Sequence, residues 1–327
     1  MVIGLTYDLR EDYLALGYTP EEVAEFDRLE TIEALEKALR ELGHRPVRIG
    51  NARSLIRALG EDEHWDLVFN ICEGLKGRAR EAQVPCILDA FDIPYTFSDA
   101  FVLAVCLDKA LTKTLIKQAG LLTPAFQVIK REEDLAKLNL PWPLFAKPLA
   151  EGTGKGITAS SKISKANEFA AKVSYLLKRY QQPVLLETFL PGREFTVGIV
   201  GTGQKARVLG TLEIILKEQA EAEVYSYQNK EECERLVEYR LVKDSQARAA
   251  EELALAAWQV LDCRDAGRID IRLDCEGRPN FLEVNPLAGL HPHHSDLPIL
   301  CSRQGLSYTE LIGLILASAS ERLKQEC

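Results

Sequence analysis

The segment that most constrains the fold is GRIDIRLDCEGRPNFLEVN, residues 267–285. Apolar and polar residues alternate along both of its halves, as they do in strands that bury one face. Glu276 and Gly277 stand between the halves, and glycine supplies the positive φ that a tight turn requires. The pattern therefore predicts a β-hairpin with a two-residue turn.

This hairpin brings charged side chains together on one face. The turn places Asp270 opposite Glu283 and Arg268 opposite Asn285, and facing residues project from the same side. The other face points into a core and comprises Ile269, Ile271, Leu273, Leu282 and Val284. Facing carboxylates repel each other unless both are solvated, one is protonated or a cation lies between them. Two carboxylates and an amide oxygen suit Mg²⁺, although a solvated edge hairpin explains the same pattern.

The composition is that of an ordinary soluble globular protein. The 327 residues allow two or three domains or one large α/β domain, with 46% hydrophobic and 27% charged residues. A net charge of −9 disfavours a nucleic-acid or anionic-membrane partner. No apolar run reaches transmembrane length, and MVIGLTYDLRED is not typical of a signal peptide. We therefore expect a cytoplasmic protein that binds neither nucleic acid nor membrane.

The cysteine pattern agrees with a reducing compartment. None of the eight cysteines forms a CxxC pair, and many lie in apolar surroundings, which favours buried thiols over a disulfide framework. They are Cys72, Cys86, Cys106, Cys233, Cys263, Cys275, Cys301 and Cys327.

The first hundred residues are typical of an open βαβ unit. VIGLT (2–6), PVRIG (46–50) and WDLVFNIC (65–72) predict strands, and the last lacks polar alternation. Such runs suit a parallel sheet that is covered on both faces. Residues 28–42 show helical spacing, and DIPYTFSD (92–99) closes the unit.

The rest of the chain alternates helices and strands around one polar segment, 217–244, that lacks clear periodicity. An extended segment, LLTPAFQVIK, follows the predicted helix at residues 108–119. The predicted helices cover residues 108–119, 164–180, 246–261 and 308–325. The predicted strands before the hairpin cover residues 143–150, 183–190, 194–201 and 206–215.

A glycine-rich loop offers a cradle for phosphate. AKPLAEGTGKGI (146–157) holds three glycines, which let backbone N–H groups approach phosphate oxygens, and two lysines. The loop lacks the spacing of a Walker A motif. A mobile surface hairpin explains it equally well when it is taken alone. Farther on, VLLETFLPGREFTV (184–197) can offer acceptors and backbone groups to an adenine edge, or is simply a charged strand end.

Taken together and in this order, the segments resemble the ATP-grasp ligases, and most closely the D-alanine–D-alanine ligase family. The acidic hairpin followed by N-x-x-x-G-L is the most specific feature. The motifs are LDKALTK (107–113), KPLAEGTGKG (147–156), LLETFLPGREFTV (185–197), YSYQNK (225–230) and GRIDIRLD…FLEVNPLAGL (267–290). The resemblance implies an α/β (α+β ATP-grasp) fold and a homodimer. Its domains would be an N-terminal parallel βαβ domain (1–105), a small central domain (106–192) and a C-terminal antiparallel-sheet domain (193–327), with ATP between the last two.

The resemblance also implies a role for each matching residue. The ATP contacts would be Lys109, Lys147 and Lys230 with phosphates, Glu187 and Leu190 with adenine, and Glu194 with the ribose. Asp270, Glu283 and Asn285 would hold two Mg²⁺ ions, for which Mn²⁺ can substitute, and Arg268 would stabilise a tetrahedral intermediate. The 152–156 loop, with Thr153 and Gly154, would close over the γ-phosphate. The implied reaction converts a carboxylate to an acyl phosphate, which an amine then attacks.

The departures from the family fall mostly at the substrate end. The GG-x-S-x-E segment is absent, and Glu25, Asp27 and Glu30 are the candidates to replace its glutamate. Glu73 stands where the family has histidine, and KGRARE (76–81) replaces an acidic GEDG. Glu73 would therefore place a negative charge in a pocket for a different or more cationic first substrate.

Two further motifs depart from the family near the catalytic loops. Thr153-Gly154 replaces a serine pair, and Glu231 replaces the tyrosine after Lys230. In HPHHSD (291–296), proline prevents a regular helical histidine pair, so a substrate loop is favoured over a transition-metal site. The resemblance places the second substrate's carboxylate near Ser295 and Leu297. We also expect one or two of the histidines, with His294 as the candidate, to donate a hydrogen bond to it.

The leading hypothesis is an ATP-dependent carboxylate–amine ligase, with D-alanyl-D-alanine as its most conventional product. The alternatives are a ligase for another amino-acid pair and a non-catalytic nucleotide-binding regulator on the same fold. A dinucleotide-dependent oxidoreductase would also start with a βαβ unit, but no G-x-G-x-x-G follows the first strand.

Overall fold

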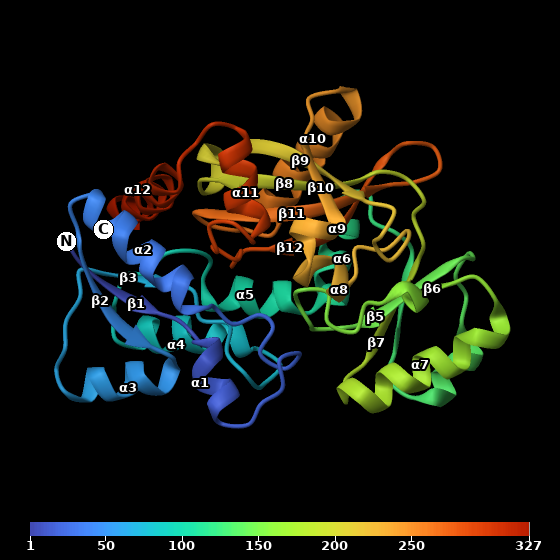
Figure 1. Cartoon of the computed structure of the whole chain (residues 1–327), viewed down its shortest axis with the longest axis horizontal. Helices are drawn as coiled ribbons and strands as arrows, with labels where there is room; N and C mark the ends of the chain where they lie inside the picture. The colour runs from blue at the N-terminus through green and yellow to red at the C-terminus, as the bar shows by residue number, and fades with distance from the viewer. Residues whose placement is uncertain (327) are drawn as a thin grey trace.

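The computed structural model describes residues 1–326, with side chains through residue 324, and contains three sheets (Figure 1). The N-terminal sheet is parallel and has the strand order β2-β1-β3. Its strands are β1 (Val2–Thr6), β2 (Arg45–Gly50) and β3 (Leu67–Asn70). The helices around it are α1 (Arg10–Ala15), α2 (Leu29–Glu41), α3 (Ala52–Gly60) and α4 (Gln83–Ala90). The predicted open βαβ unit is therefore confirmed.

Both faces of this parallel sheet are buried. Phe69 packs with residues of α2, whereas the neighbouring Val68 packs with residues of α3 and α4. Successive side chains of a strand point to opposite faces, so each face needs its own apolar residues. This requirement explains why the third strand lacks polar alternation.

The central unit is a four-stranded antiparallel sheet with the order β4-β7-β5-β6. Its strands are β4 (Phe126–Ile129), β5 (Leu144–Pro148), β6 (Lys162–Ile163) and β7 (Val184–Thr188). Helix α7 (Ala166–Tyr180) covers one face and buries Phe169, Val173 and Leu176 against it. The other face is thereby left available to a ligand.

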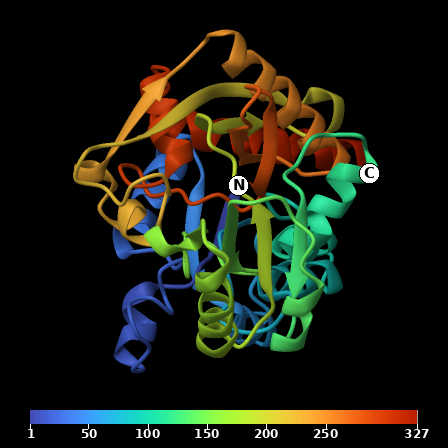
Figure 2. The same ribbon diagram turned by 90° about the vertical axis from the view of Figure 1, so that its right-hand side faces the viewer.

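The C-terminal sheet is also antiparallel and has the order β10-β9-β8-β11-β12. Its strands are β8 (Glu194–Val200), β9 (Arg207–Leu216), β10 (Val237–Leu241), β11 (Ala266–Leu273) and β12 (Pro279–Asn285). Helices α6 (Lys109–Gln118) and α10 (Ser245–Val260) pack against it. Figure 2 shows this sheet, in yellow to orange, above the green central sheet.

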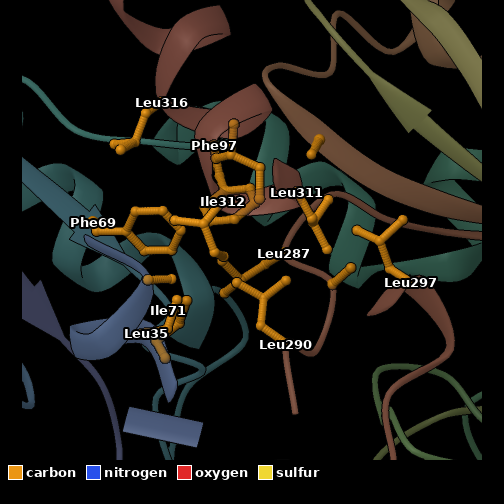
Figure 3. Close-up of a cluster of buried hydrophobic side chains, with 14 of the residues drawn as sticks. Leu35, Phe69, Ile71, Phe97, Leu287, Leu290, Leu297, Leu311, Ile312 and Leu316 are labelled. Atoms are coloured by element: carbon orange, nitrogen blue, oxygen red, sulfur yellow. The ribbon is translucent and has the colours of Figure 1, made fainter. Parts of the chain in front are cut away.

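The largest core cluster joins the two ends of the chain (Figure 3). Phe69 and Phe97 of the N-terminal unit pack with Leu287 and Leu290, which follow β12. Helix α12 (Tyr308–Glu326) adds Leu311, Ile312 and Ile315 to the same cluster. The loop after the acidic hairpin is therefore fixed against the N-terminal sheet, while the division into domains at residues 105 and 192 stays a prediction.

The hairpin register agrees with the prediction at its charged end and differs near its turn. Arg268 pairs with Asn285 and Asp270 with Glu283, as expected. The loop spans residues 274–278 instead of two residues, and a bulge beyond Asp270 compensates for the shift. The bulge turns Leu282 out of the core, so its predicted burial with Val284 is wrong. Phe281, which is fully buried, takes the core position.

Several elements escaped the sequence patterns. Helix α5 (Ala100–Leu107), AFVLAVCL, is apolar throughout, so it has no amphipathic period. The other missed helices and strands are α1, α3, α4, β6, α8 (Tyr227–Glu231), α9 (Cys233–Leu236), β10 in the polar segment, and α11 (Asp296–Arg303) after the histidines. The 3-10 turns are η1 (Arg80–Ala82), η2 (Glu132–Lys137), η3 (Ala159–Ser161) and η4 (Gly203–Lys205).

Two further sequence predictions concern the state of the cysteines and the presence of membrane-spanning helices. Cys72, Cys86, Cys106, Cys233, Cys263, Cys275 and Cys301 are all free thiols, and Cys327 lies outside the described residues. Within residues 1–326, no helix combines the length and the apolar character needed to cross a bilayer.

The bulge predicts unequal effects for two adjacent substitutions. Phe281→Ala should lower the free energy of unfolding by about 3–5 kcal/mol because it empties a core site. Leu282→Ala should lower it by only about 1 kcal/mol because this side chain is partly exposed. Urea unfolding of both variants measures the difference, and a larger loss for Leu282→Ala would contradict the observed register.

Candidate active site

A cleft of about 610 Å³ separates the central sheet from the C-terminal sheet. This volume includes space open to solvent. Its lining includes seven predicted ATP or metal residues: Lys147, Glu187, Leu190, Glu194, Lys230, Asp270 and Glu283. Segments that lie far apart in the sequence therefore converge on one cleft.

Cations surround the two facing carboxylates. Arg268 forms an ion pair and a hydrogen bond with Asp270, and the Thr196 hydroxyl donates to Asp270 Oδ1 at 2.8 Å. Lys109 Nζ lies 3.4 Å from Glu283 Oε2. The repulsion expected between the carboxylates is therefore offset by a cation on each side.

The two carboxylates have opposite pKa shifts. Burial raises the pKa of Asp270, and the adjacent Glu283 carboxylate adds to the rise, although Arg268 opposes it. Burial also raises the pKa of Glu283, but Lys109 and Lys147 outweigh it and bring that pKa well below its usual value. Glu283 is therefore ionised at neutral pH and available as a metal ligand.

The hairpin also passes a chemical test for magnesium. The buried amide nitrogen of Asn285 has no hydrogen-bond partner, so the amide can turn to present either of its polar atoms. Mg²⁺ binds through few carboxylates and takes water and phosphate oxygens for its remaining positions. Within residues 1–326, no three His, Cys, Asp or Glu side chains are arranged to hold a metal, the histidine loop included. Two carboxylates and one amide fit Mg²⁺ better than a transition metal.

A buried ion triad lies at the back of the cleft. Glu187 lies between two lysines, with Lys113 Nζ at 2.7 Å and Lys147 Nζ at 3.0 Å from its oxygens. Lys113 also donates to the carbonyl of Phe281 at 3.1 Å, and burial lowers the pKa of Lys113 to about 8. Sequence analysis missed Lys113, although it follows Lys109 by four positions and so shares its helix face.

The remaining predicted ATP residues lie along the rim of the cleft. Glu194 forms an ion pair with Arg272 at 3.0 Å. Lys230 Nζ lies 4.7 Å from the centre of the Tyr225 ring, a cation–π distance. Leu190 is buried at the adenine end that the resemblance implies. Five of the six predicted ATP residues thus line this cleft, whereas Lys109 lines the adjoining cavity.

A second cavity adjoins the first and opens toward the N-terminal sheet. It encloses about 1170 Å³, including space open to solvent, and shares Tyr225 and Lys230 with the nucleotide cleft. Its lining includes six predicted residues from four separate segments: Glu73, Thr153, Arg268, Asn285, His294 and Ser295. The predicted substrate and catalytic residues therefore meet beside the predicted ATP site.

Ion pairs distinguish the three acidic residues proposed for the first substrate. Arg80 contacts both Glu25 oxygens, at 2.8 and 2.9 Å, and so satisfies that carboxylate. Glu30 pairs with His291 at 3.2 Å. Asp27 lines the same cavity without an ion pair to any described residue, and burial raises its pKa to about 8. Asp27 is therefore mostly a neutral carboxyl group at pH 7, and a cation bound beside it would favour its ionised form.

Glu73 is not the simple negative charge expected from sequence. Burial and the neighbouring Glu81 and Glu25 carboxylates raise the pKa of Glu73 well above its usual value, although Arg80 Nη1 lies 3.8 Å away. A raised pKa favours the protonated, neutral carboxyl group. Glu73 can therefore donate a hydrogen bond, as a histidine can.

The glycine-rich loop is closed against two other segments. Thr153 and Gly154 have φ values of +49° and +73°. A Cβ on Gly154 would lie 3.0 Å from the backbone nitrogen of Tyr227, so the approach favours glycine. Lys155 Nζ reaches Glu25 at 3.4 Å, which ties the loop to the N-terminal unit.

The histidine loop is held by its own polar contacts. Ser295 Oγ accepts a hydrogen bond from the backbone nitrogen of His291 at 3.0 Å. His294 Nδ1 lies 3.6 Å from the sulfur of Cys233. The loop thus presents Ser295 and His294 to the second cavity, as the sequence-based roles require.

The fold and the charged cleft together define an ATP-grasp ligase. The chain belongs to the D-alanine–D-alanine ligase family, because the profile described as "D-ala D-ala ligase C-terminus" matches residues 115–317. D-alanine–D-alanine ligase of Aquifex aeolicus is 35% identical over 292 residues, which cover 88% of this chain and 94% of that protein. "Uncharacterized protein y4sG" of Sinorhizobium fredii is 29% identical over 305 residues, covering 89% and 87%.

Solved structures share the fold across the chain. D-alanine–D-alanine ligase from Bacillus anthracis complexed with ATP has a TM-score of 0.75 at 20% identity, and all of both chains is covered. VanG D-Ala:D-Ser ligase from Enterococcus faecalis has a TM-score of 0.74 at 20% identity and covers 97% of this chain and 99% of its own. The ATP-grasp prediction is confirmed: the protein is an ATP-using ligase with small-molecule substrates, and not an oxidoreductase.

The ion triad predicts a strong dependence of stability on Glu187. Glu187→Gln should lower the free energy of unfolding by about 3 kcal/mol, because it leaves two buried lysines without their carboxylate. Glu321→Gln, in an exposed pair with Lys205, is the control and should change little. Chemical unfolding of both variants tests this, and equal effects would mean that the triad is not a stabilising unit.

Proposed function

We propose that the protein joins two amino-acid-like substrates through an amide bond, using ATP and releasing ADP and phosphate. The observation that carries the proposal is the carboxylate pair, flanked by Lys109 and Arg268, at the junction of the nucleotide cleft and the second cavity. D-alanyl-D-alanine is the most conventional product. Another amino-acid pair is the second candidate, because Glu73 and Asp27 give the first-substrate end its own chemistry.

The nucleotide would lie between the two antiparallel sheets. We propose that Lys109, Lys147 and Lys230 contact its phosphates, Glu194 its ribose, and Glu187 with the backbone near Leu190 its adenine. Two Mg²⁺ ions, or Mn²⁺, would be held by Asp270, Glu283 and Asn285. When bound, these ions neutralise charge on the transferred phosphoryl group.

Two steps would form the product. A carboxylate oxygen of the first substrate attacks the γ-phosphorus of ATP, the bond to ADP breaks, and an acyl phosphate forms. The neutral amine of the second substrate then attacks the acyl carbon, phosphate leaves with the bonding electrons, and the proton lost from the nitrogen passes to the departing phosphate. Arg268 donates hydrogen bonds to the developing oxyanion. The closed loop around Thr153 and Gly154 excludes water, which would hydrolyse the acyl phosphate.

Opposite ends of the second cavity would hold the two substrates. We propose that Asp27 receives the ammonium group of the first substrate, and that neutral Glu73 donates a hydrogen bond beside it. Ser295 and His294 would contact the carboxylate of the second substrate. Arg268 lines the same cavity as these four residues, which supports binding of both substrates beside it.

The larger organisation remains part of the proposal. We propose domains at 1–105, 106–192 and 193–327, supported by the three separate sheets. We also propose a homodimer through the N-terminal region, supported by the family resemblance. Light scattering of the purified protein measures its mass in solution, and a monomer at all concentrations would contradict the dimer.

The direct test is ATP-dependent phosphate release over a panel of D- and L-amino acids and hydroxy acids, with product masses read in parallel. We expect a condensation product from at least one pair. ATP binding without turnover on any pair would favour the regulatory alternative.

The metal assignment predicts the effect of one isosteric change. Glu283→Gln should lower Mg²⁺-dependent turnover by at least about 100-fold, because a neutral amide replaces an ionised ligand. The control is Glu321→Gln, on the exposed face of α12. Full activity of Glu283→Gln would contradict the metal assignment.

The first-substrate end predicts a selective effect on substrate binding. Asp27→Asn should raise KM for the first amino acid by about tenfold or more, because a charged hydrogen bond to its ammonium is lost. KM for ATP should stay unchanged. Glu73→His should alter the preference among first substrates, and an unchanged profile would remove Glu73 from the specificity set.

A further inference from the structure

Arg268 is held from two sides by carboxylates. Asp270 contacts it on the metal-facing strand, and Asp296 Oδ2 lies 3.6 Å from Arg268 Nη1 on the substrate side. Asp296 is the first residue of α11, is only 8% exposed and lines the second cavity. The guanidinium therefore has two anchors, and only one of them belongs to the proposed metal site.

The second anchor is itself fixed by a tyrosine pair. The Tyr225 hydroxyl donates to Asp296 Oδ1 at 3.4 Å, and the hydroxyls of Tyr225 and Tyr239 are 2.6 Å apart. Because the Tyr225 proton is directed to Asp296, Tyr239 supplies the proton of the second bond. Tyr225 is 8% exposed, so water competes little for these bonds.

Tyr225 also contacts the nucleotide side. Lys230 Nζ stands 4.7 Å from the centre of its ring, and Tyr225 lines both cavities. Its hydroxyl and its ring therefore contact different cations: Arg268 through Asp296, and Lys230 directly. One side chain links the two cations that the proposed reaction uses at the acyl group and at a phosphate.

We propose that Asp296 and Tyr225 are positioning residues of the ligase, which act in series to orient Arg268 toward the reacting acyl group, while the Tyr225 ring separately orients Lys230. This inference rests on the proposed function, because it assigns Arg268 to the ligation step. It predicts that the hydroxyl and the ring of Tyr225 have separable kinetic effects.

A set of substitutions isolates the link to Arg268. Asp296→Asn should lower kcat for ligation by about tenfold or more, since small misplacements of a catalytic group have effects of this size, up to about 100-fold. Tyr225→Phe should lower kcat about threefold, less than a fully lost hydrogen bond to a charged group, because Asp296 remains. KM for ATP should change less than about twofold in both variants, because the ring beneath Lys230 is kept.

The double variant tests whether the two residues act in series. Asp296→Asn combined with Tyr225→Phe should have the kcat of Asp296→Asn alone, because the tyrosine acts through the carboxylate. Tyr225→Leu, which removes the ring as well, should also raise KM for ATP. Asp274→Asn, in the distant loop of the same hairpin, is the matched control and should keep parental kinetics.

The outcomes separate this inference from the proposed function. Parental kcat in Asp296→Asn, or single effects that multiply in the double variant, would overturn the positioning role while ligation by the parent chain stands. If kcat falls in parallel with the fraction of protein that binds ATP, the residue has a structural role, and the positioning role is also overturned. If Asp296→Asn does not fold, parental kcat in Tyr225→Phe overturns the series. Absence of ligation by the parent chain on every substrate pair would overturn both proposals.

Discussion

Two carboxylates that face each other across a hairpin set the central constraint of this structure. Asp270 and Glu283 cannot share one buried face without positive charge nearby. Arg268 and Lys109 supply that charge from two different segments, one on the same strand and one at the start of α6. The negative charge of the two carboxylates is therefore offset by cations from the N-terminal end of a helix and from a C-terminal strand, which lie together at this site.

The apolar side of the same hairpin holds that point in place. Ile269, Ile271 and Phe281 are fully buried, and the chain after the hairpin packs against the N-terminal sheet. The buried face of the hairpin thus supports its charged face. The glycine-rich loop is tied to the N-terminal unit by the ion pair between Lys155 and Glu25. A hairpin held by the core, together with a loop closed over the site, suits a reaction whose acyl phosphate must be protected from water.

The sequence pattern predicted the features that depend on local periodicity. Alternation indicated the hairpin and the pairing of Asp270 with Glu283, because a register shift would have moved every side chain to the other face. It could not reveal the bulge at Leu282, because a longer loop and a bulge cancel at the charged end. Asp296 and Lys113 were missed because their roles depend on partners distant in sequence.

The substrate end of the site differs from the nucleotide end in how its acidic residues are paired. Around ATP, each predicted acidic residue has a basic partner, whereas Asp27 has none among the described residues. Its contribution to the free energy of folding falls as pH rises toward 8, because the folded state holds its proton longer than the unfolded state.

In the proposed reaction, a substrate carboxylate is phosphorylated at this charged junction. The most direct measurement follows ¹⁸O from the carboxylate of the first substrate during turnover. If an acyl phosphate forms, one labelled oxygen passes into the released inorganic phosphate, and mass spectrometry detects it. Product formation with unlabelled phosphate would contradict this step.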